Sequence, residues 1–398
     1  MKVTVPAIVG GAIGVVSAVA AAGVAHERRQ VNRERAGIDP KVAALFGALP
    51  IDRESVVTAT DGVALHVEEV GPVDAPLTVV FVHGFALNLG AFHFQRRGLT
   101  EAFGDRIRMV FFDQRSHGRS GRSESADCTI EQTALDLDAV IAALVPSGPI
   151  VLVAHSMGGM TIMSLADQRP ELFRTLPVSD GRLGQFVGRL DGRLDGGRSR
   201  GRGGHDARVR GLVLINTSSG NLKTVTLGLP SFLARLRGPI LPLVLRRAAK
   251  SADLVERGRA LGKDLAWTIT KRLSFASQDV PPAVVAYCTN MIAATPVTVV
   301  SDFYPTLMAH DGTLGLMNLL DCEVVVFGAD HDALTPLAHS EAIAAALPHA
   351  ELVVVPESGH LLMLEHPAVV NRRLIAMITA VSAESGSTRL RSRVRSRK

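Results

Sequence analysis

Apolar residues along the chain fall into short runs that alternate with stretches of helical periodicity. A polar and apolar alternation over residues 54–70, broken by Asp61-Gly62, is typical of a hairpin that enters a sheet. Short, strongly apolar runs rich in β-branched residues then follow at 77–82, 107–112, 150–154 and 209–216. Runs of this length between helical patterns predict a mostly parallel sheet with helices on both faces.

The pattern changes in the second half of the chain. Residues 217–320 are rich in Leu, Ala, Arg and Met at helical spacing and are broken by several prolines, which predicts a helical cap. Strand patterns return at 323–327 and 351–355, and a final helix is expected to start near Pro367. The predicted fold is therefore an α/β fold, a mostly parallel doubly wound sheet with an inserted helical cap.

One internal segment breaks the pattern altogether. Residues 180–208 hold nine glycines and seven arginines, with the near-repeat Gly-Arg-Leu-Asp-Gly-Arg-Leu-Asp. Such a composition buries too little apolar surface to offset the entropy of ordering, so we expect a disordered surface insert. The expected organisation is a leader, a first core half that carries the insert, the cap, a second core half and a basic disordered tail, at residues 1–35, 54–216, 217–320, 321–382 and 383–398.

The formal charge of +5 is unevenly distributed. Residues 386–398 carry +6, and residues 180–208 and 1–35 carry +3 each, so the rest of the chain is net acidic. Only 4% of residues are aromatic and Trp267 is the one tryptophan, which leaves few surfaces on which nucleic-acid bases could stack. No specific nucleic-acid partner is expected; the alternative is that the basic tail and insert tether the chain to a membrane surface or a nucleic acid.

The cysteines and histidines indicate no metal centre. Cys128, Cys288 and Cys322 are an odd number without paired spacing, so neither a disulfide framework nor a zinc site is predicted, and a reducing compartment is favoured. Histidines and carboxylates show no metal-ligand spacing. We expect no metal and no organic cofactor.

The amino terminus carries an uncharged run of twenty residues, 5–24. Twenty helical residues span about 30 Å, so this run predicts a membrane anchor. Four arginines follow it within residues 28–35, which favours a cytoplasmic catalytic domain by the positive-inside rule. The alternative is secretion through a cleaved signal peptide, for which small residues such as Ala25 would supply the cleavage site.

Ser156 stands where a buried strand, a tight turn and a helix start follow one another, in Ile-Val-Leu-Val-Ala-His-Ser-Met-Gly-Gly-Met over residues 150–160. A serine hydroxyl is a weak nucleophile until a base takes its proton, and an acid must hold that base in the right tautomer. A strand-to-helix turn with small flanking residues suits such a nucleophile. Taken alone, the motif is also compatible with an ordinary helix N-cap serine.

From about Val57 to about Ala380, apart from the insert, the chain resembles the α/β-hydrolase family. The motifs that carry the resemblance are Phe-Val-His-Gly-Phe, Asp-Gln-Arg-Ser-His-Gly-Arg-Ser, the Ser156 turn, Gly-Ala-Asp-His-Asp-Ala-Leu-Thr-Pro and Pro-Glu-Ser-Gly-His, at residues 81–85, 113–120, 150–160, 328–336 and 356–360. The resemblance implies a catalytic triad of Ser156, Asp332 and His360. It also implies an oxyanion hole formed by the backbone N–H groups of Phe85 and Met157.

Some positions depart from the family pattern or admit a second interpretation. Ala154 replaces the usual glycine two residues before the serine, and it is still small. Asp330 is the alternative acid, because two carboxylates share one loop. His83 is expected to brace the oxyanion turn, His155 to pack beside the nucleophile, and His117 to be structural.

Serine at position 156 favours acyl transfer to water, whereas resemblance to epoxide hydrolases or haloalkane dehalogenases would require aspartate there. The predicted function is hydrolysis of a carboxylic ester through an acyl-enzyme. Methionines at 291, 308 and 317 in the cap favour an apolar acyl or alkyl group in the substrate, although the same residues suit plain core packing. Perhydrolysis of the haloperoxidase kind and amide or C–C bond hydrolysis use the same triad and stay open, as does a catalytically silent binding protein on this fold.

Overall fold

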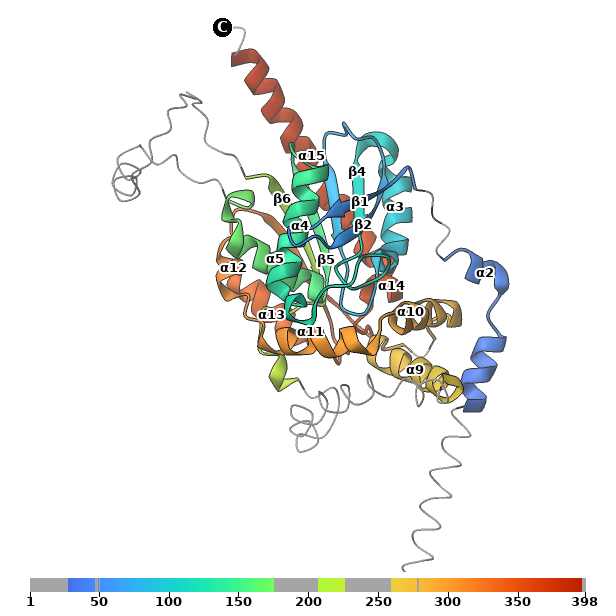
Figure 1. Ribbon diagram of the computed structural model, residues 1–398. Coiled ribbons are helices and arrows are strands. Elements are labelled where there is room, and N and C mark those ends of the chain that lie inside the picture. Colours follow the sequence, from blue (N-terminus) through green and yellow to red (C-terminus); the bar gives the residue numbers. More distant parts are fainter. Residues whose placement is uncertain are drawn as a thin grey trace, which may run out of the picture.

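The computed structural model describes residues 28–46, 49, 51–174, 207–225, 259–277 and 279–395. Within these ranges, eight strands form one sheet in the order β1-β2-β4-β3-β5-β6-β7-β8 (Figure 1). The strands are β1 (Arg53–Thr58), β2 (Ala64–Val70), β3 (Thr78–Val82), β4 (Arg108–Phe112), β5 (Ile150–His155), β6 (Val209–Ile215), β7 (Glu323–Ala329) and β8 (Glu351–Val355).

The sheet is mixed but mostly parallel. β1 pairs with β2 and β2 with β4 in antiparallel fashion, whereas β4, β3, β5, β6, β7 and β8 run parallel to one another. The β1–β2 hairpin turns at Gly62, whose φ of +90° suits glycine, and the Ala59 amide donates to the Val63 carbonyl at 2.8 Å. The predicted fold class and the predicted hairpin are both confirmed.

The helices connect the strands and cover the sheet (Figure 1). Residues 28–36 are helical, and the remaining α-helices are α2 (Pro40–Ala44), α3 (His93–Phe103), α4 (Ile130–Leu144), α5 (Met157–Gln168), α9 (Arg259–Ser274), α10 (Pro282–Ala294), α11 (Val297–Ala309), α12 (Thr313–Met317), α13 (Leu337–Ala346), α14 (Leu362–Glu365) and α15 (Pro367–Arg395). Short 3-10 helices are η1 (Leu89–Phe92), η2 (Gly104–Arg106), η3 (Ser125–Asp127), η4 (Pro170–Leu172) and η5 (Leu222–Thr224).

Alternate side chains of the buried strands supply the two halves of the core. In β3, Val79 and Phe81 join the cluster that includes residues of α3, α10 and α15, whereas Val80 and Val82 join the cluster that includes residues of α4, α5 and α13. Since both faces of the central parallel strands are covered, β3, β4 and β5 consist entirely of buried residues. This explains why they read as continuous apolar runs rather than as alternations.

Helices α9, α10 and α11 lie across the end of the sheet at which the parallel strands have their carboxyl ends (Figure 1). In the described part of residues 217–320, these three helices form the cap. Helix α12, from the same range, packs on α5 instead: a Cβ at Gly315 would lie 1.9 Å from the Met163 carbonyl oxygen. The close approach of α12 to the core therefore requires glycine at that position.

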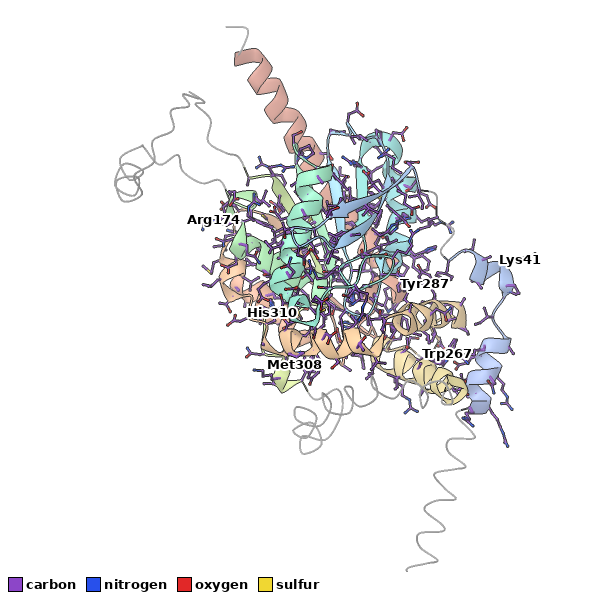
Figure 2. The ribbon with its side chains drawn as sticks, viewed as in Figure 1. Lys41, Arg174, Trp267, Tyr287, Met308 and His310 are labelled. Atoms are coloured by element: carbon purple, nitrogen blue, oxygen red, sulfur yellow. The ribbon has the colours of Figure 1, made fainter. Side chains whose placement is uncertain are left out.

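The amino-terminal segment is tied to cap helix α9. The Glu34 carboxylate accepts a hydrogen bond from the Trp267 indole N–H at 3.0 Å and pairs with Lys271 at 2.8 Å. Arg35 pairs with Asp264 at 2.9 Å. Trp267 is buried where the amino-terminal helix meets α9 (Figure 2).

Several expected segments fall outside the described residues: the leader run 5–24, nearly all of the 180–208 insert, and residues 226–258 of the cap. Among the described residues, no helix taken singly has the length and hydropathy to cross a bilayer, and only the pair α10 and α11, bent by 88°, passes that test when joined. Helix α15 starts at Pro367 as expected but continues to Arg395, so residues 383–395 are helical rather than a disordered tail. Extending an existing helix is far cheaper than nucleating one, which accounts for this difference.

Arg115, in the turn after β4, joins three parts of the fold. Its guanidinium is fully buried and binds the Asp136 carboxylate of α4 with two hydrogen bonds of 2.6 Å. A third hydrogen bond, of 2.7 Å, reaches Asp61 in the β1–β2 turn. Because a buried carboxylate without its cation is costly, this network holds the hairpin and α4 to the sheet.

Replacing Arg115 with alanine should lower the free energy of unfolding by about 3–5 kcal/mol, because Asp136 would stay buried without its partner. Arg97→Ala is the control, since Arg97 forms an exposed i,i+4 pair with Glu101 and its loss should cost about 0.5 kcal/mol or less. Urea unfolding followed by circular dichroism measures both variants. Equal midpoints for the two variants would contradict the role given to Arg115.

Candidate active site

Ser156 occupies a strained turn between β5 and α5. Its backbone has φ 51° and ψ −118°, a conformation that costs a residue with a side chain about 1–3 kcal/mol. Two contacts hold it: the Ser156 amide donates to the Ile215 carbonyl at 3.0 Å, and the Thr217 hydroxyl donates to the Ser156 carbonyl at 2.6 Å. The turn thus lifts the serine side chain out of both the strand and the helix.

Small residues around the turn are required by its packing. A Cβ at Gly158 would lie 2.1 Å from the Val82 carbonyl oxygen, and one at Gly159 would lie 2.4 Å from the Thr217 hydroxyl. Ala154 is fully buried within β5, where it pairs with both β3 and β6. The methyl group that replaces the usual glycine hydrogen is therefore accommodated in the sheet.

The segment after β3 lies against the serine. A Cβ at Gly84 would lie 2.5 Å from His155 Nδ1 and 3.1 Å from the Ser156 Cβ. Phe85 follows directly, in a chain that turns so that the Leu87 amide donates to the Gly84 carbonyl at 3.3 Å. We call residues 84–87 the oxyanion segment from here on.

The Met157 amide is the second predicted oxyanion donor. It is the first amide of α5, a position at which no preceding carbonyl of the same helix can accept a hydrogen bond. The positive end of the helix dipole adds to its attraction for negative charge. Phe85 and Met157 thus flank Ser156 from two sides of the turn.

His83 braces the oxyanion segment, as the sequence predicts. Its ring is fully buried, and burial lowers its pKa to about 4, so it is neutral at physiological pH. The Gln114 amide donates to His83 Nε2 at 2.9 Å, which places the ring proton on Nδ1, and Nδ1 donates to the Gly84 carbonyl at 2.8 Å. The tautomer is fixed by these two partners.

Asp332 and His360 come together from two loops that follow β7 and β8. His360 Nδ1 lies 2.8 Å from Asp332 Oδ2. Asp332 also accepts from the Leu334 amide at 2.8 Å, the Thr335 amide at 2.9 Å and the Thr335 hydroxyl at 2.8 Å. Burial raises the pKa of Asp332, but His360 and the Thr335 hydrogen bonds outweigh it and hold the pKa below its usual value.

An ionised Asp332 fixes the His360 ring. With Nδ1–H donated to the carboxylate, the second ring nitrogen, Nε2, is left free to take up a proton. This is the arrangement that general-base chemistry requires.

The alternative acid, Asp330, faces elsewhere. It contacts His331 Nδ1 at 2.8 Å and accepts from the Ser358 amide at 3.2 Å. Its side chain is one-third exposed, whereas the Asp332 side chain is fully buried. Of the two carboxylates, the structure brings Asp332 to the histidine.

The loop that carries His360 is held on several sides. The His360 carbonyl oxygen lies 2.9 Å from His155 Nε2 and accepts a hydrogen bond from the Asn216 side-chain amide at 3.0 Å. The Glu365 carboxylate accepts from the Gly359 amide at 2.7 Å and from the Ala276 amide at 3.0 Å. Glu365 therefore joins this loop to the segment that leaves α9.

His155 connects the Ser156 turn to the histidine loop. Its ring lies 4.7 Å from the His360 ring, centroid to centroid. Burial, followed by the nearby His360, lowers its pKa to about 3, so it is neutral and donates from Nε2 to the His360 carbonyl. This matches the packing role expected for it and leaves it no free proton to exchange from that nitrogen.

An apolar cluster adjoins the oxyanion segment on the cap side. Phe85 packs against Phe303 of α11 with ring centroids 6.0 Å apart, and His117 lies edge-on to both rings. Burial lowers the pKa of His117 to about 3, and its Nδ1 contacts the Arg115 carbonyl at 2.8 Å. The cluster is completed by residues from the core, the cap and the segment between them: Cys128, Ile130, Met157, Met160, Leu222, Val225, Val299, Leu307 and Met308.

The described residues offer no group of three or more His, Cys, Asp or Glu side chains placed to hold a metal ion. Cys128, Cys288 and Cys322 are buried and unpaired, and burial raises the pKa of each thiol.

Two residues that hold the site were not singled out from the sequence. Asn216 anchors the His360 loop, and Thr335 binds Asp332 while its hydroxyl oxygen lies 2.9 Å from the Asn216 carbonyl oxygen. Their common signal is position: Asn216 directly follows β6, and Thr335 lies in the loop after β7. Polar residues at the carboxyl ends of parallel strands meet at one edge of the sheet.

A protein-family model described as the alpha/beta hydrolase family matches residues 79–373. Over 108 residues the chain is 38% identical to the sn-1-specific diacylglycerol lipase ABHD11 of Mus musculus and, over 108 residues, 35% identical to the probable oxidoreductase EphD of Mycobacterium bovis. Each match covers 27% of this chain, and it spans only 34% of the mouse protein and 17% of the mycobacterial one.

A solved structure of a thermophilic esterase from Thermogutta terrifontis is similar to the chain with a TM-score of 0.57. The match covers 83% of this chain and 99% of that one, at 24% sequence identity. At this identity the likeness shows the shared fold.

Gly84→Ala should lower the free energy of unfolding by about 1–3 kcal/mol, because the added methyl group would overlap the buried His155 ring. Gly37→Ala is the matched control, since a Cβ there would meet only ordinary contacts of 3.4 Å and more. Thermal and urea unfolding of the two variants measure the difference. A Gly84→Ala protein as stable as wild type would show that the segment does not press against the Ser156 turn.

Proposed function

We propose a function from one premise: this chain belongs to the alpha/beta hydrolase family. It is a serine hydrolase that cleaves a carboxylic ester through an acyl-enzyme on Ser156. The observation that carries the proposal is the 2.8 Å contact between His360 Nδ1 and Asp332 Oδ2, on the loops that flank the strained serine turn. The contact supplies an oriented base at the edge of the sheet where the serine projects.

In the first step His360 Nε2 takes the proton of the Ser156 hydroxyl while the serine oxygen bonds to the ester carbonyl carbon. The carbonyl π electrons move to its oxygen, which the Phe85 and Met157 N–H groups stabilise. His360 then gives its proton to the departing alkoxide, so an alcohol leaves and the acyl group stays on Ser156.

Water reverses these roles in the second step. His360 takes a proton from a water molecule as its oxygen attacks the acyl carbon, and the resulting tetrahedral oxyanion uses the same two N–H groups. Collapse of this intermediate returns the proton to Ser156 and releases the carboxylic acid. Asp332 keeps the ring in the productive tautomer and stabilises its positive charge throughout.

The apolar cluster supports an ester with an apolar acyl or alkyl group. Phe85, Met157 and Phe303 of that cluster belong to the oxyanion segment, the serine turn and the cap. Phe85 is half-buried whereas Met157 and Phe303 are fully buried, so a substrate group would pack on Phe85, with a gain of about 25 cal/mol for each Å² of apolar surface removed from water. The names of the mouse relative, a diacylglycerol lipase, and of the solved structure, an esterase, support ester hydrolysis.

Ser156→Ala should abolish hydrolysis of p-nitrophenyl esters by the full-length chain, with a loss of order 10⁴-fold or more, because no other group can form the acyl-enzyme. Wild type should also be labelled at Ser156 by a fluorophosphonate probe. Ser164→Ala is the matched control, since Ser164 lies on the same helix and its hydroxyl only accepts from Gln168. A series from acetate to palmitate measures the preference for apolar acyl groups.

Folded wild-type protein that neither turns over these esters nor takes up the probe would refute the serine-hydrolase proposal. Activity that survives Ser156→Ala would refute the assignment of the nucleophile. Equal kcat/KM values along the ester series would agree with ester hydrolysis but would refute the proposed preference for an apolar acyl group.

Asp332→Asn should lower kcat by about 10⁴-fold, as loss of the acid does in triad enzymes of this kind, because the amide stabilises the wrong histidine tautomer. Asp330→Asn removes the other carboxylate of the loop and should keep kcat close to that of wild type. Steady-state kinetics on p-nitrophenyl butyrate compares the two. The reverse order of effects would show that Asp330 is the acid.

A further inference from the structure

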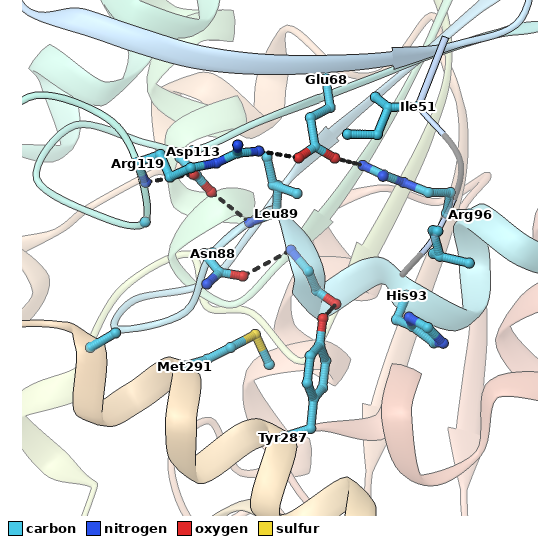
Figure 3. Close-up of a pocket in the computed structure, with 14 residues that line it drawn as sticks. Ile51, Glu68, Asn88, Leu89, His93, Arg96, Asp113, Arg119, Tyr287 and Met291 are labelled. Atoms are coloured by element: carbon cyan, nitrogen blue, oxygen red, sulfur yellow. Dashed lines mark hydrogen bonds and ion pairs between the residues drawn. The ribbon is translucent and has the colours of Figure 1, made fainter. Parts of the chain in front are cut away.

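Cap helix α10 contacts the backbone of the oxyanion segment and of the residues that follow it. The hydroxyl of Thr295, the C-cap residue directly after α10, donates to the Ala86 carbonyl at 3.3 Å. The Tyr287 hydroxyl of the same helix donates to the carbonyl of Gly90, which lies shortly after the oxyanion segment in the sequence, at 2.9 Å. Figure 3 shows Tyr287 reaching up from α10 to this backbone, beside Asn88.

The residue that Thr295 contacts is under strain. Ala86 has φ 58°, a left-handed conformation that disfavours residues with a Cβ by about 1–2 kcal/mol. Strained backbone persists only where surrounding contacts hold it. Ala86 directly follows Phe85, so any change in its conformation would re-aim the Phe85 N–H.

Thr295 is itself rigidly placed. It is 8% exposed, and its own amide donates to the Ile292 carbonyl at 3.1 Å, which closes the last turn of α10. The hydroxyl is therefore presented to Ala86 by a fixed backbone.

Tyr287 sits directly on the backbone at Gly90. A Cβ at Gly90 would lie 2.3 Å from the tyrosine oxygen, so glycine is needed for the contact. The Gly90 amide donates to the Asn88 side chain at 2.9 Å, so both peptide groups that flank the Gly90 Cα are hydrogen-bonded. These residues line a cavity of about 370 Å³ behind the oxyanion segment (Figure 3).

The ring of Tyr287 is also fixed from the other direction. Phe46 of the amino-terminal segment packs against it in a tilted arrangement with ring centroids 4.8 Å apart, and the His93 ring lies 5.9 Å away. Burial raises the pKa of Tyr287 well above its ordinary value, so the hydroxyl stays protonated and remains a donor.

We propose that Thr295 and Tyr287 are positioning residues, which hold the oxyanion segment so that the Phe85 N–H points at the developing oxyanion. The inference rests on the proposed ester hydrolysis. Through these two hydroxyls the cap takes part in transition-state stabilisation as well as covering the site.

The proposal has a kinetic signature. The oxyanion exists only in the transition state and in the tetrahedral intermediates, so a misplaced donor weakens the transition state and leaves ground-state binding almost unchanged. A displacement of about 1 Å at a catalytic group can cost 10²-fold in rate. Loss of the two hydroxyls should therefore lower kcat and spare KM.

The experiment compares Thr295→Val, Tyr287→Phe and the double variant in the full-length chain, with p-nitrophenyl butyrate as substrate. Thr289→Val is the matched control: Thr289 lies on the same helix, is also buried, and its hydroxyl donates to the Val285 carbonyl within α10. Thr295→Ser restores the hydroxyl and serves as the rescue variant.

We expect kcat to fall by about 10-fold in each single variant and by up to about 100-fold in the double variant, with KM within about twofold of wild type. Thr289→Val and Thr295→Ser should keep kcat near the wild-type value. Binding of a trifluoromethyl ketone, which forms a tetrahedral adduct with the serine, should weaken in parallel with kcat. Hydrogen exchange should quicken in the peptide that contains residues 84–90 in Thr295→Val but not in Thr289→Val.

Unchanged kcat in the double variant would overturn the proposal, and so would an equal loss in Thr289→Val, which would indicate a general effect on α10. A rise in KM at constant kcat would also overturn it, because it would assign the hydroxyls to substrate binding. Wild type without any Ser156-dependent turnover is a different outcome: it refutes the proposed function, while the hydrogen-exchange comparison still tests whether the two hydroxyls hold the segment.

Discussion

The left-handed backbone at Ser156 is the constraint on which the rest of the site depends. A residue with a side chain adopts this conformation only where neighbouring contacts stabilise it. Here these are hydrogen bonds with the Ile215 carbonyl and the Thr217 hydroxyl at the end of β6. Gly158 allows α5 to approach β3 so closely that a Cβ would lie 2.1 Å from the Val82 carbonyl oxygen. The turn thus requires three neighbouring parallel strands in register, β3, β5 and β6, so the position of the serine depends on these strands together.

The histidines around this turn are all buried and differ in their partners. His83 and His155 are buried without a carboxylate partner, so their pKa values lie at about 4 and about 3, and both serve as neutral hydrogen-bonding braces. His360 instead lies 2.8 Å from Asp332, so a positive charge on its ring has a partner in a region of low dielectric. The same residue type therefore supplies fixed braces and, in the proposed reaction, the base.

The sequence predicted those features that depend on short stretches of chain. Buried parallel strands are apolar on both faces, so their runs stand out, and the serine turn, the late aspartate and the glycine–histidine step each have a local pattern. Gly98 within helix α3 has no local explanation, and the reason for it is non-local: a Cβ there would lie 2.3 Å from the Asn371 side chain of α15. The contacts of Asn216 and Thr335 with His360 and of Thr295 with Ala86 are equally non-local, since each joins two segments that are more than twenty-four residues apart in the sequence.

The contacts of α10 also limit how the cap can move. The helix is bound to the oxyanion segment and the backbone behind it on one side, and through Tyr287 to Phe46 of the amino-terminal segment on the other. Under the proposed role of Thr295, a displacement of α10 that breaks its 3.3 Å contact with Ala86 also releases the strained donor segment. An open cap of that kind would admit substrate to a site unable to stabilise the oxyanion. On this proposal, α10 must be in contact with Ala86 at the moment when the oxyanion forms.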